Sequence, residues 1–244
     1  MSQSLDRGLI ILKALAEESL SLSQISDLLD VHKSTALRLL RVLEQNKIVK
    51  HDVDRKYRLS SGLFSLATQS VDALEVVPIS KPHLRSLSDE TGLTVHLAEF
   101  NGHDVTYLAK HESRESVRMY SRIGIAAPLH ATAVSKAILA QLPDEEIDAM
   151  LRNYKLKKFT EKTITRKPDL IKEIVKVRSS GYSVDNREHE DFVHCIGVGV
   201  KAEPYGAIYG ISLTATTFTT PLKELIKFVP NLQRCAKAIT SQLA

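Results

Sequence analysis

Two amphipathic helical patterns, joined by a tight turn at residues 30–31, place the strongest constraint on how this chain can fold. Ser21 and Gln24 match a capping box, and apolar residues then recur at three-to-four spacing through the first pattern. The second pattern is VHKSTALRLLRVLEQ, residues 31–45, and a further apolar pattern covers residues 5–17. We expect the apolar face of the second helix to pack against the two helices before it. The sequence therefore predicts three helices around a small core.

A basic β-hairpin is predicted directly after these helices. The segment IVKHDVDRKYRLS reads as two short strands around an Asp-rich turn at residues 52–55. Between residues 32 and 58 there are eight basic and three acidic side chains, a net charge of +5, whereas the whole chain carries only +4. Positive charge concentrated in one window is typical of a face that binds duplex DNA.

The polar face of the predicted helix at 31–45 supplies candidate DNA contacts. A charged helix face alone is more often a solvated surface, but the capped helix before it and the basic hairpin after it favour DNA binding. Short hydroxyl side chains at the start of such a helix can reach bases or phosphates, and Arg38 is long enough to contact a guanine with two hydrogen bonds. Arg41 and Arg55 are better placed to hold phosphates. The candidate DNA-binding residues are Lys33, Ser34, Thr35, Arg38, Arg41 and Arg55.

The rest of the chain predicts a mixed α and β domain. A helical pattern that Pro78 and Pro82 interrupt forms a candidate connector. TVHLAEF and DVTYLAKH flank Asn101-Gly102, a strong hairpin signal, and helices are predicted at 82–92, 130–142 and 169–180. SVRMYS, YSVD, CIGVGV and AIYGISLT read as strands. Strands grouped in hairpins, rather than alternating with helices, indicate the α+β class.

Composition and termini point to a cytoplasmic protein. The 244 residues include two cysteines, Cys195 and Cys235, which provide no disulfide framework and fit a reducing compartment. The first ten residues lack the basic start and apolar run of a secretory signal. No apolar stretch approaches the roughly 20 residues that a membrane span needs, so we expect no membrane partner.

Together these segments resemble the IclR family of bacterial transcription regulators. The resemblance is carried in order by SLDRGLIILKALAE, LSLSQISDLLDVHKSTALRLLRVLEQNKIV, KYRLSSGLFSLA, PHLRSLSDETGLTVHLAEFNGHDVTYLAK, PLHATAVSKAILAQLP, FTEKTIT and IVKVRSSGYSVDNREHEDFVHCIGVGV. It implies a winged helix-turn-helix DNA-binding domain at 1–60, a linker helix at 61–77, and a GAF-like mixed α/β effector-binding and oligomerisation domain at 78–244. It further implies a homodimer or a tetramer of two dimers on a palindromic operator. Repressor and activator share this architecture.

A candidate effector site lies in the second domain. Ser212 and Thr214 alternate along AIYGISLT and so face one side of that strand, Cys195 begins another strand, and His130 lies at the start of a predicted helix. The family resemblance implies the same places and adds further contact and wall positions. The candidate effector-binding residues are Met119, Ala127, His130, Ala133, Val134, Asp185, Val193, Cys195, Ser212 and Thr214.

Each of these residues also has an ordinary structural interpretation. Cys195 can be a small buried apolar residue, Asp185 a turn residue, Met119 plain core, and His130 only a helix cap. The chain departs from many relatives at Ser135, where they have Gly, and at His194, where they have Arg or a similar group. Because Ala127 is small for its wall position, we expect the pocket to take a bulkier organic acid than a two- or three-carbon one, such as an aromatic acid.

The enzyme and metal alternatives have weaker support. His189 and His194 are five residues apart in REHEDFVHC, which is not the helical zinc-pair spacing, and no third ligand accompanies them. A hydrolase that uses Cys195 with His130 or His194 is conceivable, but adjacent strand residues point to opposite faces. The chain has no glycine loop of the kind that binds phosphate. We therefore expect no enzyme activity, no cofactor and no metal.

Overall fold

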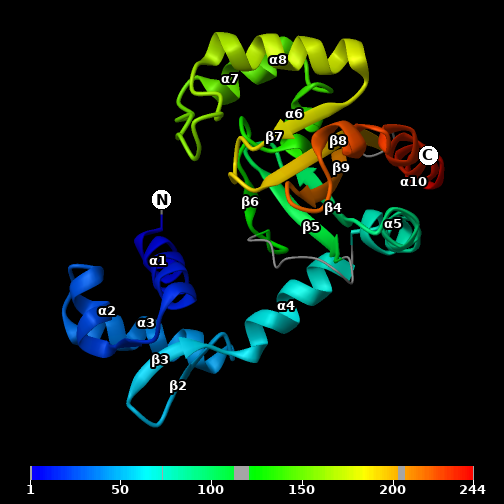
Figure 1. The fold of residues 1–244 in the computed structure, drawn as a ribbon. Coiled ribbons are helices and arrows are strands. Elements are labelled where there is room, and N and C mark those ends of the chain that lie inside the picture. Colours follow the sequence, from blue (N-terminus) through cyan, green and yellow to red (C-terminus); the bar gives the residue numbers. More distant parts are fainter. Residues whose placement is uncertain (1, 73, 113–120, 203–206, 244) are drawn as a thin grey trace. The chain divides into compact units, whose positions relative to one another are not determined.

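The computed structural model describes residues 2–72, 74–112, 121–202 and 207–243 (Figure 1). The chain divides into two compact units, Met1–Ala73 and Leu74–Ala244. Within the described residues, every helix is too short or too polar to cross a membrane.

The first unit is a three-helix core joined to a small antiparallel sheet of order β1-β3-β2. Its core is formed by apolar side chains from all three helices and the sheet, with Ile11, Ile25 and Leu40 fully buried. Its elements are α1 (Gln3–Glu17), β1 (Leu20–Ser21), α2 (Leu22–Leu28), α3 (Lys33–Gln45), β2 (Val49–His51), β3 (Lys56–Leu59) and α4 (Ser61–Asp72).

Local sequence signals explain how α2 and α3 meet. The predicted capping box is confirmed, because the Ser21 side chain accepts the Gln24 N–H and the Gln24 side chain accepts the Ser21 N–H. The turn between the helices passes through Asp30 with φ +49°, a left-handed conformation that Asp tolerates. The predicted basic hairpin is also confirmed, with Val49 opposite Leu59 and His51 opposite Tyr57.

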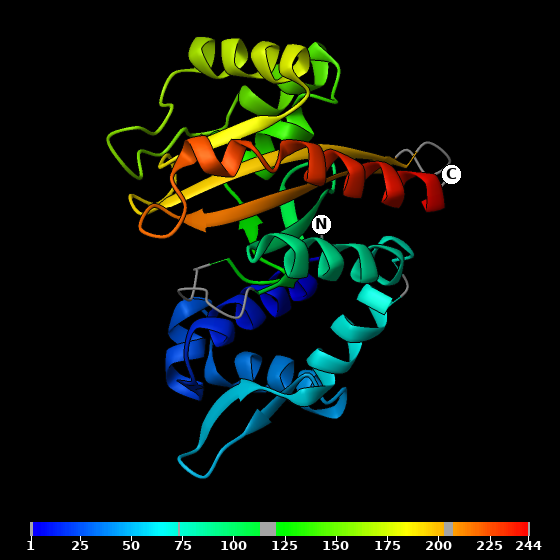
Figure 2. The same cartoon turned by 45° about the vertical axis from the view of Figure 1, so that its right-hand side comes forward.

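The second unit is a six-stranded antiparallel sheet of order β6-β5-β4-β9-β8-β7, covered by helices on both faces. Helices α6, α7 and α8 cover one face, and α5 and α10 pack on each other across the opposite face (Figure 2). Its elements are α5 (Val76–Thr91), β4 (Thr94–Phe100), β5 (Val105–His111), β6 (Ala126–Ala127), α6 (Ala133–Leu139), α7 (Asp144–Leu151), α8 (Lys167–Ser180), β7 (Ser183–Asn186), β8 (Val193–Ala202), β9 (Ala207–Thr216), α9 (Leu222–Ile226) and α10 (Val229–Leu243).

Glycine brings α6 very close to this sheet. A Cβ atom at Gly197 would lie 2.7 Å from the Ala133 carbonyl oxygen and from Ser183 Oγ. At Gly210 it would lie 2.9 Å from the Ile138 side chain. Because β8 and β9 carry no side chain at these points, α6 can lie very close to the strands along its length.

Several predicted elements are confirmed, two differ, and one lies almost wholly outside the described residues. The Asn101-Gly102 hairpin joins β4 to β5, with Gly102 at φ +90°. The helix predicted at 82–92 begins earlier, at Val76, because Pro78 falls in its first turn, where a backbone N–H has no intrahelical acceptor. The helix predicted from residue 130 begins at Ala133 instead, because Thr132 caps it. The strand predicted as SVRMYS lies, apart from its last residue, outside the described residues.

Candidate functional site

Helix α3 exposes a basic face in the first unit. Ala36 and Leu40 are buried, and Thr35 is half-buried. The remaining predicted contacts on this helix are all exposed, namely Lys33, Ser34, Arg38 and Arg41. The alternation follows from the 3.6-residue helical period, which turns apolar positions to the core and basic ones to solvent.

Arg55 lies at the tip of the β2–β3 hairpin. It is exposed and has φ +58°, and Asp52 Oδ1 shapes the turn by accepting the Asp54 and Lys56 N–H groups. Among the described residues, none of the four basic side chains at Lys33, Arg38, Arg41 and Arg55 forms an ion pair with a carboxylate of this chain. Their charges are therefore free to meet an anionic partner such as a phosphate backbone.

The second unit contains a cavity of about 220 Å³ between the α6 face of the sheet and the segments that cover it. Strands β4, β5, β7, β8 and β9 form its floor, and the start of α6, residues 121–128 and the β7–β8 loop form its walls. The lining residues are His96, Tyr107, Ser121, Ile125, Ala126, Pro128, Thr132, Ala133, Val134, Asp185, His189, Glu190, Val193, Cys195, Ser212 and Thr214.

Strand pairing assembles the polar floor of the cavity. Asp185 lies opposite Cys195, and Cys195 lies opposite Thr214, so these three form one row across β7, β8 and β9. In the next row on the same face, Ser212 lies opposite His96 of β4. Because side chains two residues apart on a strand share a face, alternation alone brings these polar groups together.

His96 is a neutral, hydrogen-bonded imidazole in this floor. Its Nε2 lies 2.8 Å from Ser121 Oγ and its Nδ1 lies 3.4 Å from Thr214 Oγ1. Burial, and to a smaller extent the charge of Lys110, lower its pKa from 6.5 to about 3. His96 therefore adds a polar group without positive charge to the floor, and it orients the Ser121 and Thr214 hydroxyls.

Asp185 is the buried carboxyl group of the floor, with only 2% of the residue exposed. Its Oδ1 accepts the backbone N–H of Glu188 at 2.7 Å. Burial, followed by the nearby Glu188 carboxyl, raises the pKa of Asp185 to about 7. Burial likewise raises the pKa of Glu190 in the cavity wall. Near neutral pH, Asp185 can therefore occur in both its charged and its neutral form.

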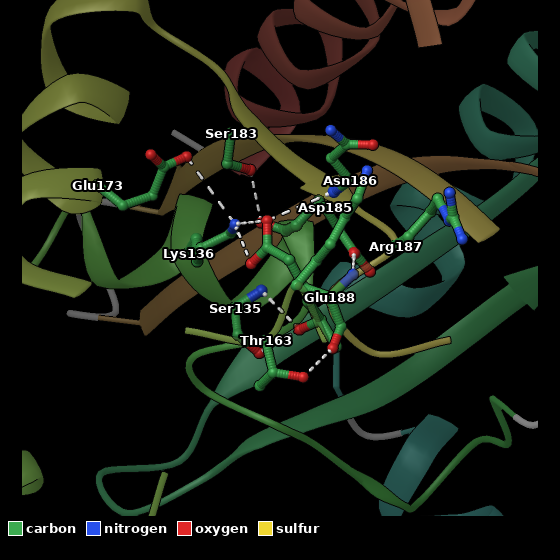
Figure 3. A network of polar contacts seen from close by, with 12 residues as sticks. Ser135, Lys136, Thr163, Glu173, Ser183, Asp185, Asn186, Arg187 and Glu188 are labelled. Atoms are coloured by element: carbon green, nitrogen blue, oxygen red, sulfur yellow. Dashed lines mark hydrogen bonds and ion pairs between the residues drawn. The ribbon is translucent and has the colours of Figure 1, made fainter. Parts of the chain in front are cut away.

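A buried ion pair lies behind Asp185. Lys136 of α6 is fully buried, and its Nζ lies 2.7 Å from both carboxylate oxygens of Glu188 and 3.9 Å from Glu173 of α8 (Figure 3). Burial raises the pKa of Glu188, and Lys136 opposes that rise. Thr163 Oγ1 donates to the Glu188 carbonyl at 2.6 Å. These contacts fix the β7–β8 loop against α6 and α8, and so hold Asp185 in place.

Most of the predicted effector residues meet in this cavity. Those that line it are Ala133, Val134, Asp185, Val193, Cys195, Ser212 and Thr214. Met119 lies outside the described residues. Ala127 is buried but does not line the cavity. Its carbonyl accepts a hydrogen bond from the Ser135 hydroxyl at 3.3 Å, so Ser135, where many relatives have Gly, has a structural role.

His130 does not reach the cavity, contrary to the sequence-based expectation. It is fully buried, with Nδ1 3.3 Å from the Tyr154 hydroxyl and Nε2 2.9 Å from the Lys157 carbonyl. The helix starts at Ala133, so two residues separate His130 from the first helical turn, and both ring nitrogens bind the segment after α7. Its position is that of a packing residue behind the wall.

Cys195 is held as a thiol. Its Sγ lies 3.2 Å from Thr214 Oγ1, and burial raises its pKa well above the ordinary value. A protonated thiol is a weak nucleophile. His194, its neighbour on β8, belongs to the opposite side of the strand and does not line the cavity. In the part of the chain that the structure describes, no cluster of His, Cys, Asp and Glu side chains could hold a metal ion.

Sequence reasoning missed several lining residues. His96 could have been found, because it alternates with Thr94 and Ala98 in a strand that the hairpin signal already marked. No sequence signal places Tyr107, Ser121 or Glu190 at the same cavity, since strand order and loop path bring them there.

Comparison with known proteins agrees with both units. Residues 4–53 match the IclR helix-turn-helix domain, and residues 68–241 match the bacterial transcriptional regulator IclR C-terminal domain. The chain is 32% identical over 244 residues to the HTH-type transcriptional regulator XynR of Escherichia coli, covering 99% of this chain and 97% of that protein.

Solved structures show the same architecture. The Thermotoga maritima IclR structure has a TM-score of 0.79 and 28% identity, with 100% of this chain and 99% of that chain covered. An IclR homologue from Microbacterium hydrocarbonoxydans, solved in complex with 4-hydroxybenzoate, has a TM-score of 0.83 over 98% of both chains, but its identity of 21% shows the fold alone. The exposed basic α3, the matched domain models and this full-length similarity lead to one conclusion: the chain belongs to the IclR family and is a DNA-binding transcriptional regulator.

Proposed function

We propose that this regulator binds a palindromic operator as a homodimer or as a tetramer of two dimers, and that a small organic acid in the cavity changes that binding. The observation that carries the proposal is that one unit has an exposed basic helix and the other has a cavity with a polar floor. A basic helix supplies DNA affinity, and a cavity supplies a means of regulating it.

The operator proposal rests on geometry. In a helix-turn-helix protein the second helix enters the major groove, and its first residues meet base edges. Ser34 and Arg38 lie in the first half of α3 and read bases, whereas Arg41 and Arg55 hold phosphates. One such domain contacts few phosphates, so a second copy is needed to reach useful affinity. Two copies place two recognition helices about 34 Å apart, in successive major grooves.

The effector proposal rests on the size and polarity of the cavity. An apolar protein cavity of roughly 150 Å³ binds benzene, so about 220 Å³ accommodates one aromatic ring with small substituents. The polar floor of His96, Asp185, Ser212 and Thr214 orients such a ligand by hydrogen bonds. This volume replaces the small side chain of Ala127 as the reason for preferring an aromatic acid. A protein of the same fold has been crystallised with 4-hydroxybenzoate, which is an acid of this kind.

Regulation requires that the acid bind one arrangement of the protein more tightly than another, because a ligand with equal affinity for both changes nothing. The segment 61–77, which joins the DNA-binding domain to the effector domain, is the proposed transmitter. It includes α4 and the start of α5.

Fluorescence anisotropy tests both halves of the proposal. Labelled DNA from the intergenic region upstream of the protein's own gene is titrated with the protein across a salt series, with random duplex as control and with organic acids, including benzoate and 4-hydroxybenzoate, added in turn. We expect selective binding with a steep salt dependence, altered by at least one acid. Equal weak binding to both duplexes would contradict the operator proposal.

Two variants separate the halves. Arg38→Ala should weaken operator binding with or without the acid, because it alters the basic face alone. Thr214→Val, close in volume, should leave acid-free DNA binding intact and weaken the response to the acid, because Thr214 lies on the cavity floor. An unchanged response in Thr214→Val would place the effector elsewhere.

A further inference from the structure

The charge of the cavity does not match an anionic ligand. Its lining contains two carboxyl groups, Asp185 and Glu190, and no Lys or Arg among the described residues. The imidazole of His96 is hydrogen-bonded and uncharged, as argued above. Lys136 lies behind Asp185, but both oxygens of Glu188 contact its ammonium group at 2.7 Å. Lys110, whose charge lowers the pKa of both His96 and Glu190, contacts the Ser121 carbonyl at 3.2 Å and the Glu112 carboxylate at 2.8 Å. Among the described lining residues, an organic acid that enters this cavity therefore meets only negative or neutral side chains.

Asp185 is enclosed by titratable groups from every element packed against it. They comprise Tyr107 of β5, Lys136 of α6, Cys195 of β8, and Glu188, His189 and Glu190 of the β7–β8 loop, with His96 of β4 also on the cavity floor and Glu173 of α8 beyond Lys136. Only Lys136 in this set carries a positive charge near neutral pH, and Glu188 neutralises it. In such a low-dielectric site the negative charge of Glu188 disfavours ionisation of Asp185.

We propose, on the basis of the effector function above, that Asp185 binds the acid in its protonated form. Its O–H donates a hydrogen bond to the ligand carboxylate, so that binding of the anion takes up one proton from solvent. Asp185 is then a specificity-determining hydrogen-bond donor of the cavity. Atoms and charge balance, since the proton comes from water or buffer, is added to the Asp185 carboxylate, and no bond in the ligand breaks.

The geometry of the carboxyl group permits this role. Asp185 Oδ1 accepts the Glu188 N–H, and a protonated carboxyl group keeps acceptor capacity while it gains one donor. The pKa of Asp185, raised to about 7 by burial and by Glu188, makes the required proton available near neutral pH. An ionised ligand beside Asp185 raises this pKa further, because like charges disfavour ionisation.

The direction of the pH dependence follows. Below about pH 7 Asp185 is already protonated, so the acid binds at its full affinity with little proton uptake. Above that pH, binding of each anion requires that Asp185 take up one proton from solvent. The affinity for the acid then falls by up to about tenfold per pH unit until the pKa of Asp185 in the complex is reached. Proton uptake therefore rises from near zero at about pH 6 toward one at about pH 8.

Isothermal titration calorimetry of the full-length protein tests the proposal. The probes are benzoate and 4-hydroxybenzoate, each with its neutral amide as a control, titrated at about pH 6 and pH 8 in two buffers with different protonation enthalpies. The difference in heat between the buffers gives the number of protons taken up. We expect one or both acids to bind with proton uptake that increases with pH. This measurement requires only the wild-type protein.

Two variants assign the proton. Asp185→Asn keeps the shape of a protonated carboxyl group and still donates, so it should bind the acid without proton uptake and with pH-independent affinity. Glu190→Gln makes the matched change at the other carboxyl group of the cavity and should keep the wild-type proton uptake. Uptake that disappears in Glu190→Gln but persists in Asp185→Asn would overturn the assignment.

The outcomes separate this inference from the proposed function. Binding of the acids without proton uptake, or binding of neither acid at millimolar concentration, would overturn the inference. If an acid binds without uptake yet changes operator binding in the anisotropy experiment, the regulatory proposal stands and the inference fails. If an acid binds with uptake through Asp185 but leaves operator binding unchanged, the inference stands and the regulatory proposal fails.

Discussion

The two units carry their functional residues in opposite environments. On α3, charged side chains stand exposed on one face of a single helix, without ion-pair partners among the described residues. In the second unit, the polar groups that line the cavity come from five strands, from the residue that caps α6 and from two loops, and those of β4, β7, β8 and β9 are buried. The comparison shows that a charged side chain acts differently on an exposed helix and in a buried cavity. On the surface it attracts DNA at long range, whereas in the cavity burial decides whether a group is charged at all.

The largest effect on stability is expected at the buried Lys136–Glu188 ion pair, where burial makes an unpaired charge costly. Lys136→Met leaves the Glu188 carboxylate buried without its cation, and we expect the free energy of unfolding of the second unit to fall by about 3–5 kcal/mol. Urea denaturation monitored by circular dichroism measures it. Lys172→Met, on the exposed side of α8, is the matched control and should change stability by about 0.5 kcal/mol or less. Equal effects of the two substitutions would contradict the role of the pair.

His96 should make the second unit sensitive to acid. Its pKa is lowered from 6.5 to about 3 in the folded state, so below about pH 6.5 the unfolded chain binds a proton that the folded one does not. Stability is then present above this pH and is lost as the pH falls, by up to about 1.4 kcal/mol per unit. His96→Gln should flatten this part of the profile.

The comparison of variant with wild type isolates His96. Asp185, with its pKa raised to about 7, shifts stability in the opposite direction over the same range, because the folded state binds its proton first. Denaturation at a series of pH values measures both profiles. The exposed His103→Gln is the control, and an equal flattening in that variant would contradict the assignment to His96.

On the exposed side of the comparison, Arg38→Ala should weaken operator binding by roughly 1–3 kcal/mol and relax the preference at one base pair, if Arg38 contacts a base. Anisotropy on a set of operators with single substitutions measures this. Gln45→Ala, exposed at the end of the same helix, should have little effect. Uniform weakening on every sequence would instead make Arg38 a phosphate contact.

The smallest effect is expected at the hairpin tip. Arg55→Ala removes one phosphate contact, so affinity should fall evenly on operator and random DNA, and the slope of log affinity against log salt should decrease by about 1. A salt titration measures it. Loss of selectivity, rather than of slope, would show that the hairpin reads sequence.

Local patterns in the sequence were sufficient for much of the fold. The capping box at Ser21, the basic face of α3 and the hairpin at Asn101-Gly102 all depend on residues within a few positions of each other. The predicted starts of two helices were wrong because one local signal competed with another. Thr132 caps α6 and so moves its start away from His130, while Pro78 is accommodated in the first turn of α5.

The sequence by itself determined the two-part organisation, the amphipathic α3 and the strand alternation that turns Ser212 and Thr214 to one face, because helical and strand periods are local properties. Only the tertiary structure decided that His96 and Glu190 join them, and that Lys136 meets Glu188, 52 residues away. The charge states of these groups depend on burial and on neighbours from other elements, and no local pattern records either. The proposed DNA-binding face could therefore be predicted from the sequence, whereas the charge of the cavity depends on the assembled sheet and its loops.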